Sequence, residues 1–352
     1  MTDAPRPRQA VLNMAPYSPP TSGRAGKLRL DFNENTVGCS PRVLEFLRER
    51  LSANEIAVYP EYGEARAAVA RFFEVPPENL LFTNGTDEAI QVLINTYVDD
   101  GDEVLLLRPS YAMYRFYSDV AGAAVREIGY RDADLAFPLE ELLEAAGPAT
   151  RAILIANPNN PTGSAVSLRG IERILDRAPG AAVLIDEAYF EFCGTTALPL
   201  LSSRPNLFVS RTFSKAFGMA AMRIGCLMSQ AANIGFLHKA QSPYSVNTLA
   251  VLAASVAIQD RAYIENYVAE ALLARETLCR GLERLGIGYY PSQGNFILAK
   301  IGPRSIEIRD RLRDKGVLVR DRSYEIAGAV RITAGTCEQA GRFLDELEKI
   351  WR

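Results

Sequence analysis

Histidine is nearly absent from this sequence, since His238 is the only one among 352 residues. A Ser-His-Asp triad, a Cys-His dyad and a His-rich metal site would all have to use His238, which has no acid or nucleophile motif beside it. These enzyme classes are therefore disfavoured, and the sequence predicts no metal site. His238 itself is expected to be a surface or hinge residue.

Paired cysteines and long apolar runs are also missing. The five cysteines are far apart, with no C-x-x-C pair and no histidine nearby, which argues against a disulfide framework or a zinc site and fits a reducing cytosol. The N-terminal MTDAPRPRQA has no apolar signal core, and the most apolar later stretch, Leu249 to Ile258, is too short to span a bilayer. We therefore expect a cytoplasmic protein without a membrane segment.

The third absence is an excess of charge of one sign: the net charge is −3, and Lys and Arg are scattered along the chain. Nucleic acid and anionic membranes are therefore disfavoured as partners, and a small-molecule substrate is favoured. Apolar residues, in contrast, make up 48% of the composition, which suffices to bury a large core over about two domains.

Strand and helix patterns alternate after an N-terminal arm. Residues 1–32 are rich in Pro, Arg and Ser without periodicity and predict an extended arm packed on another element or subunit. Residues 33–243 predict a large domain with a mostly parallel sheet, because short buried strands alternate with helical segments. The expected strands are Asn79–Thr83, Glu103–Arg108, Ala152–Ala156, Ala182–Asp186 and Leu207–Arg211, and the expected helices include Asp87–Tyr97 and Leu168–Ala178.

Residues 244–352 predict a smaller α+β domain, packed with the arm. A long helical stretch from Asn247 to about Leu285, broken near Asp260, is expected to join the two domains. Strands and helices follow it in an order that is typical of an α+β domain. The expected strands are Asn295–Ala299, Val317–Arg320 and Ala329–Thr333, and the expected helices are Ser305–Lys315 and Cys337–Ile350.

Lys215 lies in the strongest local motif, Ser210-Arg-Thr-Phe-Ser-Lys-Ala-Phe-Gly218, and Arg223 follows eight residues after it. A lysine just after a buried strand can be desolvated and flanked by cations, and both effects free its amine to attack an aldehyde. Thr212, Ser214 and Arg223 supply two hydroxyls and a guanidinium, which suit a dianionic phosphate. A loop lysine alone is usually a solvated surface residue, so the other motifs decide the interpretation.

Asp186 and Tyr189 stand at another strand end. Asp186 ends the expected strand Ala182–Asp186, and Tyr189 follows three residues later. Ligands of α/β folds bind at the carboxyl ends of strands, where a carboxylate can keep a pyridine nitrogen protonated and a phenol can bond the neighbouring ring oxygen. Asp186 could instead be a Walker-B-type metal ligand, but no G-x-x-x-x-G-K-[ST] sequence accompanies it.

Two turn motifs complete the set. In the segment from Asn157 to Gly163, the prolines and the glycine force a turn, which can aim Asn160 at the same ring oxygen. In Gly85-Thr86-Asp87, Gly85 allows a tight turn, and the N–H groups of the next two residues at a helix start can bind an anion. Taken alone, Thr or Asp before a helix is normally only a cap.

These motifs, in this order, resemble the fold-type-I aminotransferases that use pyridoxal 5′-phosphate (PLP), and most closely the histidinol-phosphate aminotransferase family. The resemblance runs from about Tyr17 to Glu346 and includes Asn33-Glu-Asn35, Tyr59-Pro and Arg331-Ile-Thr-Ala-Gly335. It implies the α/β fold of aspartate aminotransferase, with a mostly parallel seven-stranded sheet in the large domain beside the smaller α+β domain.

The resemblance also implies roles for individual residues. Lys215 is implied to be the Schiff-base lysine, Asp186 the partner of the pyridinium nitrogen, and Tyr189, together with Asn160, a ligand of the ring oxygen. Tyr59 is implied to reach the cofactor phosphate from the neighbouring subunit, which implies a homodimer with shared sites, although a Tyr-Pro turn can also simply bury an aromatic ring. The remaining implied cofactor contacts are Tyr111, stacked on the ring, and Gly85, Thr86, Asp87, Thr212, Ser214 and Arg223, around the phosphate.

The implied reaction is ping-pong transamination between histidinol phosphate and 2-oxoglutarate, a step of histidine biosynthesis. Its implied substrate-binding residues are Tyr17, Asn35, Arg320 and Arg331. A bidentate guanidinium suits a carboxylate or a phosphate, so Arg331 could bind both substrates in turn.

Other functions share parts of this pattern. An aromatic amino-acid aminotransferase and a phosphoamino-acid decarboxylase share every cofactor motif, so both stay open. A PLP-binding regulatory module without turnover is disfavoured, because such modules usually come fused to a DNA-binding domain and the short proline-rich N-terminus leaves no room for one. A nicotinamide dehydrogenase would need a G-x-G-x-x-G sequence after its first strand, and none is present.

Overall fold

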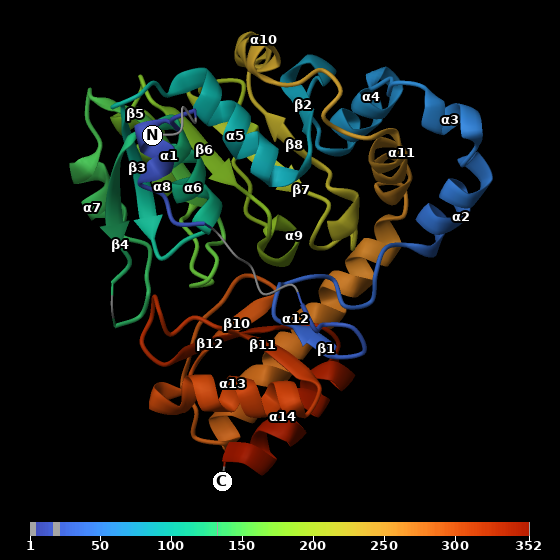
Figure 1. Cartoon of the computed structure of the whole chain (residues 1–352), viewed down its shortest axis with the longest axis vertical. Helices are drawn as coiled ribbons and strands as arrows, with labels where there is room; N and C mark the ends of the chain where they lie inside the picture. The colour runs from blue at the N-terminus through green and yellow to red at the C-terminus, as the bar shows by residue number, and fades with distance from the viewer. Residues whose placement is uncertain (1–4, 17–21, 132, 352) are drawn as a thin grey trace.

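The computed structural model describes residues 5–16, 22–131 and 133–351, which form a large and a small domain (Figure 1). In Figure 1 the small domain lies below the large one, and the blue strand β1 (Leu28–Leu30) lies among its orange and red elements. The described part of the predicted arm is therefore not simply extended. It contains a short helix, α1 (Gln9–Leu12), which contacts α6 of the large domain, and β1, which pairs with the small domain.

The sheet of the large domain has seven strands in the order β2-β8-β7-β6-β5-β3-β4. All neighbouring strands are parallel except for β8, which is antiparallel to both β2 and β7, so the predicted mostly parallel seven-stranded sheet is confirmed. The five strands expected from the sequence are present with ends shifted by at most two residues. In order along the chain, the strands are β2 (Leu80–Thr83), β3 (Glu103–Arg108), β4 (Ala124–Gly129), β5 (Thr150–Ala156), β6 (Ala182–Asp186), β7 (Leu207–Thr212) and β8 (Gly225–Met228).

Strands β4 and β8 were not expected. The sequence of β4, AVREIG, is largely exposed at the sheet edge and lacks the apolar run that marks a buried strand. The other, β8, has only four residues, GCLM, and follows the motif around Lys215. Only pairing with neighbours fixes both as strands.

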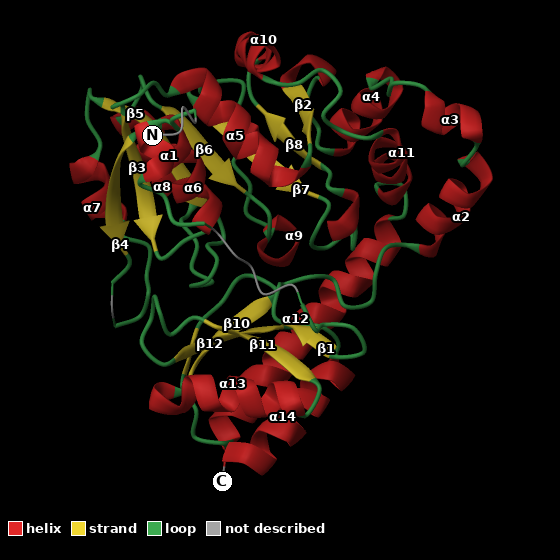
Figure 2. Ribbon diagram, viewed as in Figure 1, coloured by secondary structure: helices red, strands yellow, loops and turns green. Residues whose placement is uncertain are grey.

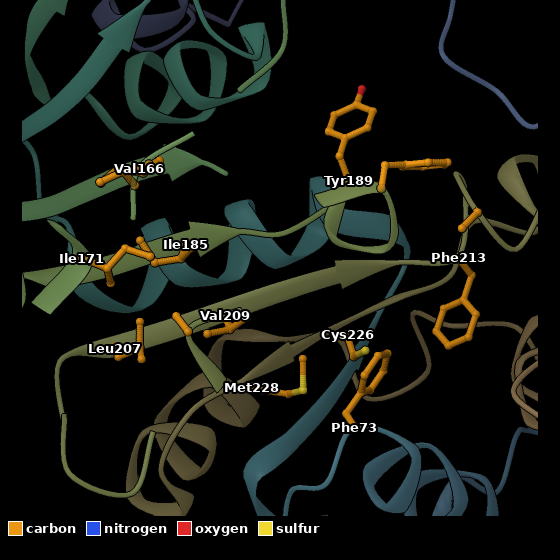
Figure 3. Close-up of a cluster of buried hydrophobic side chains, with 14 of the residues drawn as sticks. Phe73, Val166, Ile171, Ile185, Tyr189, Leu207, Val209, Phe213, Cys226 and Met228 are labelled. Carbon is orange, nitrogen blue, oxygen red and sulfur yellow. The ribbon is translucent and has the colours of Figure 1, made fainter. Parts of the chain in front are cut away.

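Helices cover both faces of this sheet (Figure 2). On one face α8 begins after Ser167, whose side chain accepts a hydrogen bond from the N–H of Gly170, and it buries Ile171, Ile174 and Leu175 at helical spacing. Figure 3 shows part of this cluster, with Ile171 near the sheet residues Ile185 and Val209. The large-domain helices are α2 (Pro41–Arg50), α3 (Ala53–Ala57), α4 (Gly63–Phe72), α5 (Gly85–Tyr97), α6 (Ala112–Ala121), α7 (Leu139–Ala145), α8 (Leu168–Arg177), α9 (Phe190–Cys193) and α10 (Ala231–Ala240).

The small domain has a five-stranded sheet in the order β1-β11-β12-β10-β9. The strand β1 is parallel to β11, and the other pairs are antiparallel. Arm residues thus extend the small-domain sheet, which agrees with the predicted packing of the arm on this domain. Its remaining elements are β9 (Tyr289–Tyr290), β10 (Phe296–Lys300), α13 (Ser305–Asp314), β11 (Val317–Asp321), β12 (Ala329–Thr333) and α14 (Cys337–Trp351).

Two helices, α11 (Thr248–Ala257) and α12 (Arg261–Arg284), connect the domains, and the expected break near Asp260 is present. The apolar side chains of α11 join the large-domain core. Along α12, Ala271 still belongs to that core, whereas Ala274 and Leu278 belong to the core of the small domain. The two hydrophobic cores therefore meet along α12, and the predicted boundary at residue 244 stays a prediction.

His238 is exposed on α10, and all five cysteines are free thiols. Among the residues that the structure describes, no helix is both long and apolar enough to cross a membrane.

Candidate active site

A cavity of about 530 Å³ lies between the domains, where the strands β5, β6 and β7 end. Side chains from motifs that are far apart in the sequence meet here, because neighbouring parallel strands end at the same edge of the sheet. The predicted site residues that line the cavity are Thr86, Asp87, Tyr111, Asn160, Asp186, Tyr189, Thr212, Ser214, Lys215, Arg223, Arg320 and Arg331.

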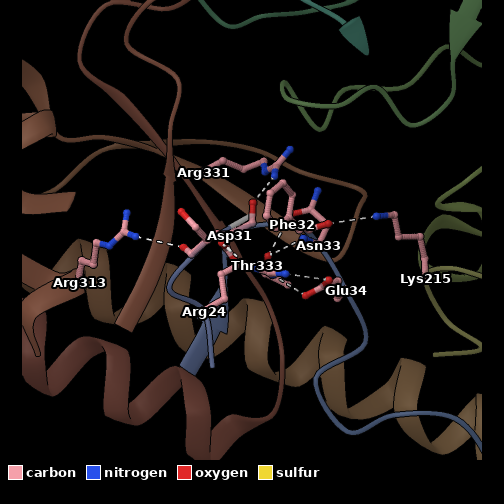
Figure 4. Close-up of polar contacts among 10 residues, drawn as sticks. Arg24, Asp31, Phe32, Asn33, Glu34, Lys215, Arg313, Arg331 and Thr333 are labelled. Carbon is pink, nitrogen blue, oxygen red and sulfur yellow. Dashed lines mark hydrogen bonds and ion pairs between the residues drawn. The ribbon is translucent and has the colours of Figure 1, made fainter. Parts of the chain in front are cut away.

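Lys215 follows β7 and extends across the cavity toward the arm (Figure 4). Its Nζ donates a hydrogen bond to the backbone oxygen of Phe32, at 3.1 Å, and lies 5.7 Å from the ring centroid of Tyr189. The amine is thus held in the cavity by one neutral acceptor, with no carboxylate paired to it in the described residues.

Asp186 is a buried carboxylate at the end of β6. It accepts hydrogen bonds from the hydroxyls of Tyr114, at 2.8 Å, and Ser210, at 2.9 Å. Burial raises the pKa of Asp186 to about 6, and the two hydroxyl donors oppose that rise. Neither donor was expected from the sequence. The sequence could have indicated Ser210, because this residue lies opposite Asp186 in the register of the neighbouring strands β7 and β6. For Tyr114, the only indication was its position one helical turn after Tyr111.

Gly85 and Arg223 meet at the start of α5. Gly85 has a φ of +72°, and a Cβ atom there would lie 2.4 Å from Nη2 of Arg223, so only glycine allows this approach. The hydroxyl of Thr86 is buried and has no hydrogen-bond partner among the described residues. Arg223 also lies 3.5 Å from the hydroxyl of Ser214 and pairs with Asp87 at 3.3 Å. The arrangement leaves donors directed at one small region.

Arg331 of β12 is buried on the opposite wall. It donates to the backbone oxygen of Asp31, at 2.6 Å, and to the side-chain oxygen of Asn160, while its Nε has no partner in the described residues. Burial lowers the pKa of Arg331 to about 10. An unused donor on a buried guanidinium suits an anionic ligand.

A further charged residue on this wall, Arg24, was not indicated by the sequence. Arg24 pairs with Asp31 at 2.9 Å and with Glu34 at 2.7 Å, and its guanidinium lies 4.3 Å from the ring centroid of Phe32. Arg320 lies 5.5 Å from the same ring centroid. Phe32 thus packs against two cations that face the cavity. Arg24 lies in the aperiodic arm, so no sequence pattern marks it.

The side chains of two predicted site residues, Asn35 and Tyr59, do not line the cavity. Asn35 does not line the cavity: its side chain accepts from the N–H groups of Val37 and Gly38 and donates to the oxygen of Ala216. These bonds give it a structural task and no direct place in the substrate site. Tyr59 is 72% exposed and stacks on another tyrosine away from the cavity. Tyr17 lies outside the described residues.

A buried ion pair lies directly behind the cavity wall. Arg211 and Glu187 are 3% and 0% exposed, and their charged groups are 2.7 Å apart. The guanidinium also stacks on Phe190, at 3.5 Å from the ring centroid. Glu187 follows Asp186 in sequence and Arg211 precedes Thr212, so the pair joins the ends of β6 and β7 beneath the site.

Comparison with known proteins agrees with this arrangement. Residues 25–347 match the family described as aminotransferase class I and II. The chain is 38% identical over 320 residues to a histidinol-phosphate aminotransferase from Bacillus cytotoxicus, across 89% of this chain and 85% of that protein. The chain therefore belongs to the class I and II aminotransferase family, and it is an enzyme that transfers amino groups.

Two solved structures show the same fold. One is a histidinol-phosphate aminotransferase from Sinorhizobium meliloti in complex with PLP, with a TM-score of 0.90 and 25% identity, covering 99% of this chain and 98% of that one. The other is a mutant aspartate aminotransferase from Thermus thermophilus, with a TM-score of 0.84 and 24% identity, covering 99% and 100%. The predicted aspartate-aminotransferase fold and the resemblance to histidinol-phosphate aminotransferases are confirmed.

Proposed function

We propose that this enzyme binds PLP in the cavity between its domains and transfers the amino group of histidinol phosphate to 2-oxoglutarate. The main support for the proposal is that Lys215, Asp186 and the cluster around Arg223 line one cavity. An amine, a buried carboxylate and a set of phosphate donors are the three groups that a pyridine aldehyde phosphate requires.

The residues present fit this cofactor. The hydroxyl of Thr86, which has no hydrogen-bond partner among the described residues, and the guanidinium of Arg223, which lies against Gly85, supply donors for its phosphate at the start of α5. Thr212 and Ser214, at the end of β7 and just beyond it, add hydroxyls on the same side. The ring would lie toward Asp186, with Tyr111 as the aromatic side chain that can stack on it.

When bound, PLP supplies an electrophilic aldehyde carbon and a protonated ring that accepts the electrons released at the substrate's α-carbon. Lys215 would hold the cofactor through its amine, and the same amine would serve as the base that removes the proton from the substrate's α-carbon. Asp186 holds the ring nitrogen protonated, while Tyr189 and Asn160 provide polar groups for the ring oxygen.

For the substrate, the proposal relies on cations of the small-domain wall. Arg331 and Arg320 line the cavity, and two guanidiniums suit the phosphate of histidinol phosphate or the carboxylates of the second substrate. Tyr17 stays a predicted contributor. The name of the Bacillus cytotoxicus relative supports the same substrate.

Two measurements test the proposal. Borohydride reduction of the purified enzyme followed by peptide mass spectrometry should place the cofactor on Lys215, and a label on another lysine would contradict the site. Absorbance changes in single half-reactions with histidinol phosphate, phenylalanine, aspartate and glutamate should be fastest for histidinol phosphate and glutamate. Faster conversion of phenylalanine would assign the enzyme to the aromatic aminotransferases, and release of CO₂ to the decarboxylases.

We further propose a homodimer in which Tyr59 of one subunit completes the site of the other. Ile56, Val58 and Tyr59 are 67%, 52% and 72% exposed, and a second copy would cover this apolar segment. Hybrid dimers of Tyr59→Phe and Lys215→Ala subunits should recover activity, because one of their two sites carries neither change. If the hybrids are no more active than the parents, Tyr59 does not act across subunits. The cytoplasmic location stays a prediction.

A further inference from the structure

Asn33 opens the Asn33-Glu-Asn35 motif and is fully buried where the arm meets both domains (Figure 4). Its backbone φ is +54°, in the left-handed region that asparagine tolerates better than most residues. The residue follows Phe32, whose backbone oxygen accepts from Lys215. Asn33 thus stands one position beyond the backbone that contacts the central lysine.

The small domain holds Asn33 through two side chains. The hydroxyl of Thr333 accepts from the backbone N–H of Asn33 at 3.0 Å and donates its own proton to the side-chain oxygen of Asn33 at 3.1 Å. The side-chain amide of Asn295 donates to the backbone oxygen at 3.3 Å. Thr333 and Asn295 are both completely buried, so these bonds are shielded from water.

The remaining polar group of Asn33, its side-chain nitrogen, contacts the large domain. The side-chain nitrogen of Asn33 lies 3.0 Å from the hydroxyl oxygen of Tyr189. Because Thr333 has a single proton and gives it to the amide oxygen, the NH₂ end must face Tyr189, and an NH₂ group can only donate. The oxygen of Tyr189 is therefore an acceptor toward Asn33, which leaves its own proton free to point into the cavity.

We propose that Asn33 is a positioning residue that fixes the direction in which Tyr189 donates its proton to a cofactor. The inference rests on the proposed function, since it requires PLP with an anionic ring oxygen beside Tyr189. It also links the small domain to this contact, because Thr333 determines which end of the Asn33 amide faces the phenol.

Other groups facing Tyr189 cannot replace this bond. The Nζ of Lys215 lies 5.7 Å from its ring centroid, Arg331 is close enough for its charge to interact with the phenol, and Phe296 packs on the ring edge at 5.3 Å. None of the three forms a hydrogen bond with the Tyr189 oxygen within the described chain. Asn33 is therefore the group that orients it.

Asn33→Gly tests the inference with little backbone strain, because glycine adopts a φ of +54° freely and keeps both backbone bonds. A hydrogen bond donated to an anionic ring oxygen makes the neighbouring proton of the cofactor–lysine linkage easier to lose. In Asn33→Gly the hydroxyl of Tyr189 is no longer oriented toward that oxygen. The pH midpoint of the visible cofactor absorption should therefore rise. We expect a rise of about one pH unit, the equivalent of one hydrogen bond. Recording the spectra without an amino donor separates this readout from turnover.

Tyr189→Phe should raise the midpoint in the same direction, and Asn33→Gly should add nothing in that background. Asn35→Ala is the matched control: it removes the other asparagine of the motif and should lower thermal stability without moving the midpoint. If Asn33→Gly leaves the midpoint unchanged while Tyr189→Phe moves it, the inference is wrong and the proposed function stands. Wild-type enzyme without any PLP absorption would overturn both.

A second pair of variants decides the matter if Asn33→Gly does not fold. Thr333→Val removes the hydroxyl that orients the amide and should raise the midpoint, whereas Thr333→Ser keeps the hydroxyl and should behave as the wild type. Equal midpoints in the two variants would overturn the inference.

Discussion

The two walls of the cavity are held in place by different means. On the large-domain wall, Asp186 and Lys215 stand at or just after the ends of strands, and the parallel pairing of β6 with β7 sets where they point. On the opposite wall, Arg331 and Asn33 are positioned by bonds to residues about 300 positions away, Asp31 and Thr333. One wall depends on backbone ladders, and the other on side chains from separate segments.

This difference predicts how each wall responds to substitution. The hydrogen bonds between two strands are made by the backbone and do not involve the side chain at the strand end. Replacing that side chain therefore affects catalysis more than it affects the stability of the fold. A wall built from side-chain contacts between segments couples binding to the relative position of the domains. Five variants test the contrast.

Lys215→Ala should have the largest effect. Turnover should fall by more than about 10⁴-fold, the upper end of what acid–base catalysis alone provides, because the covalent contact is lost as well. Since the phosphate contacts come from other residues, the variant should still fold and retain cofactor without a covalent bond. Activity assays and dialysis check this, and an unfolded variant would show that the strand-end wall is less independent than the ladder suggests.

Glu187→Gln should have the largest effect on stability. It leaves the guanidinium of Arg211, 3% exposed, with only the more distant carboxylate of Glu191, at 3.7 Å, and breaking a buried pair costs about 3–5 kcal/mol of unfolding free energy. Urea unfolding of the enzyme measures the change. A loss below about 1 kcal/mol, the range of exposed pairs, would mean that the ion pair does not anchor β6 to β7.

Arg320→Ala tests the side-chain wall. A charge-assisted hydrogen bond contributes roughly 1.5–3 kcal/mol, so kcat/KM for histidinol phosphate should fall by about 10- to 100-fold. Phenylalanine, which has no phosphate, should lose less. Equal losses for both substrates would remove Arg320 from phosphate recognition and favour an aromatic substrate.

Tyr114→Phe should weaken cofactor binding by about tenfold at pH 7, the equivalent of one hydrogen bond. Burial is the main cause of the raised pKa of Asp186, about 6, and the Tyr114 bond lowers it, so losing that bond raises it further. Because the carboxylate must be ionised to pair with a pyridinium, affinity falls as the pH drops through this pKa, and the fall should begin at a higher pH in the variant.

Cofactor dissociation constants between pH 6 and 8.5 measure this shift. Tyr117→Phe, one turn along the same helix, is the control, since no hydrogen bond joins its hydroxyl to Asp186 in the described structure. The same pH profile in Tyr114→Phe and wild type would show that Tyr114 only packs against the carboxylate.

Arg173→Ala should have the smallest effect. Arg173 and Glu140 are 2.6 Å apart, but their side chains are 45% and 65% exposed. Water and salt screen such pairs, so the urea midpoint should not change measurably. A shift comparable to that of Glu187→Gln would contradict the distinction between buried and exposed pairs.

Much of the large-domain wall could be predicted from the sequence. Strands that are buried on both faces are continuous apolar runs, and polar residues at their ends or shortly after them, such as Asp186 and Asn160, stand out. The motif around Lys215 could be placed in the same way, because it directly follows the buried strand β7. The structure brings these residues to one cavity, although their roles stay proposals.

The other wall was decided by the tertiary structure. Nothing local distinguishes Arg24 in the aperiodic arm, and the sequence pointed to Asn35, whereas the residue that contacts Tyr189 is Asn33. The Asn33–Thr333 and Tyr114–Asp186 bonds exist only because separate segments fold side by side. A sequence pattern reports the period and burial of its own segment, while the partner of a side chain depends on which distant segment packs against it.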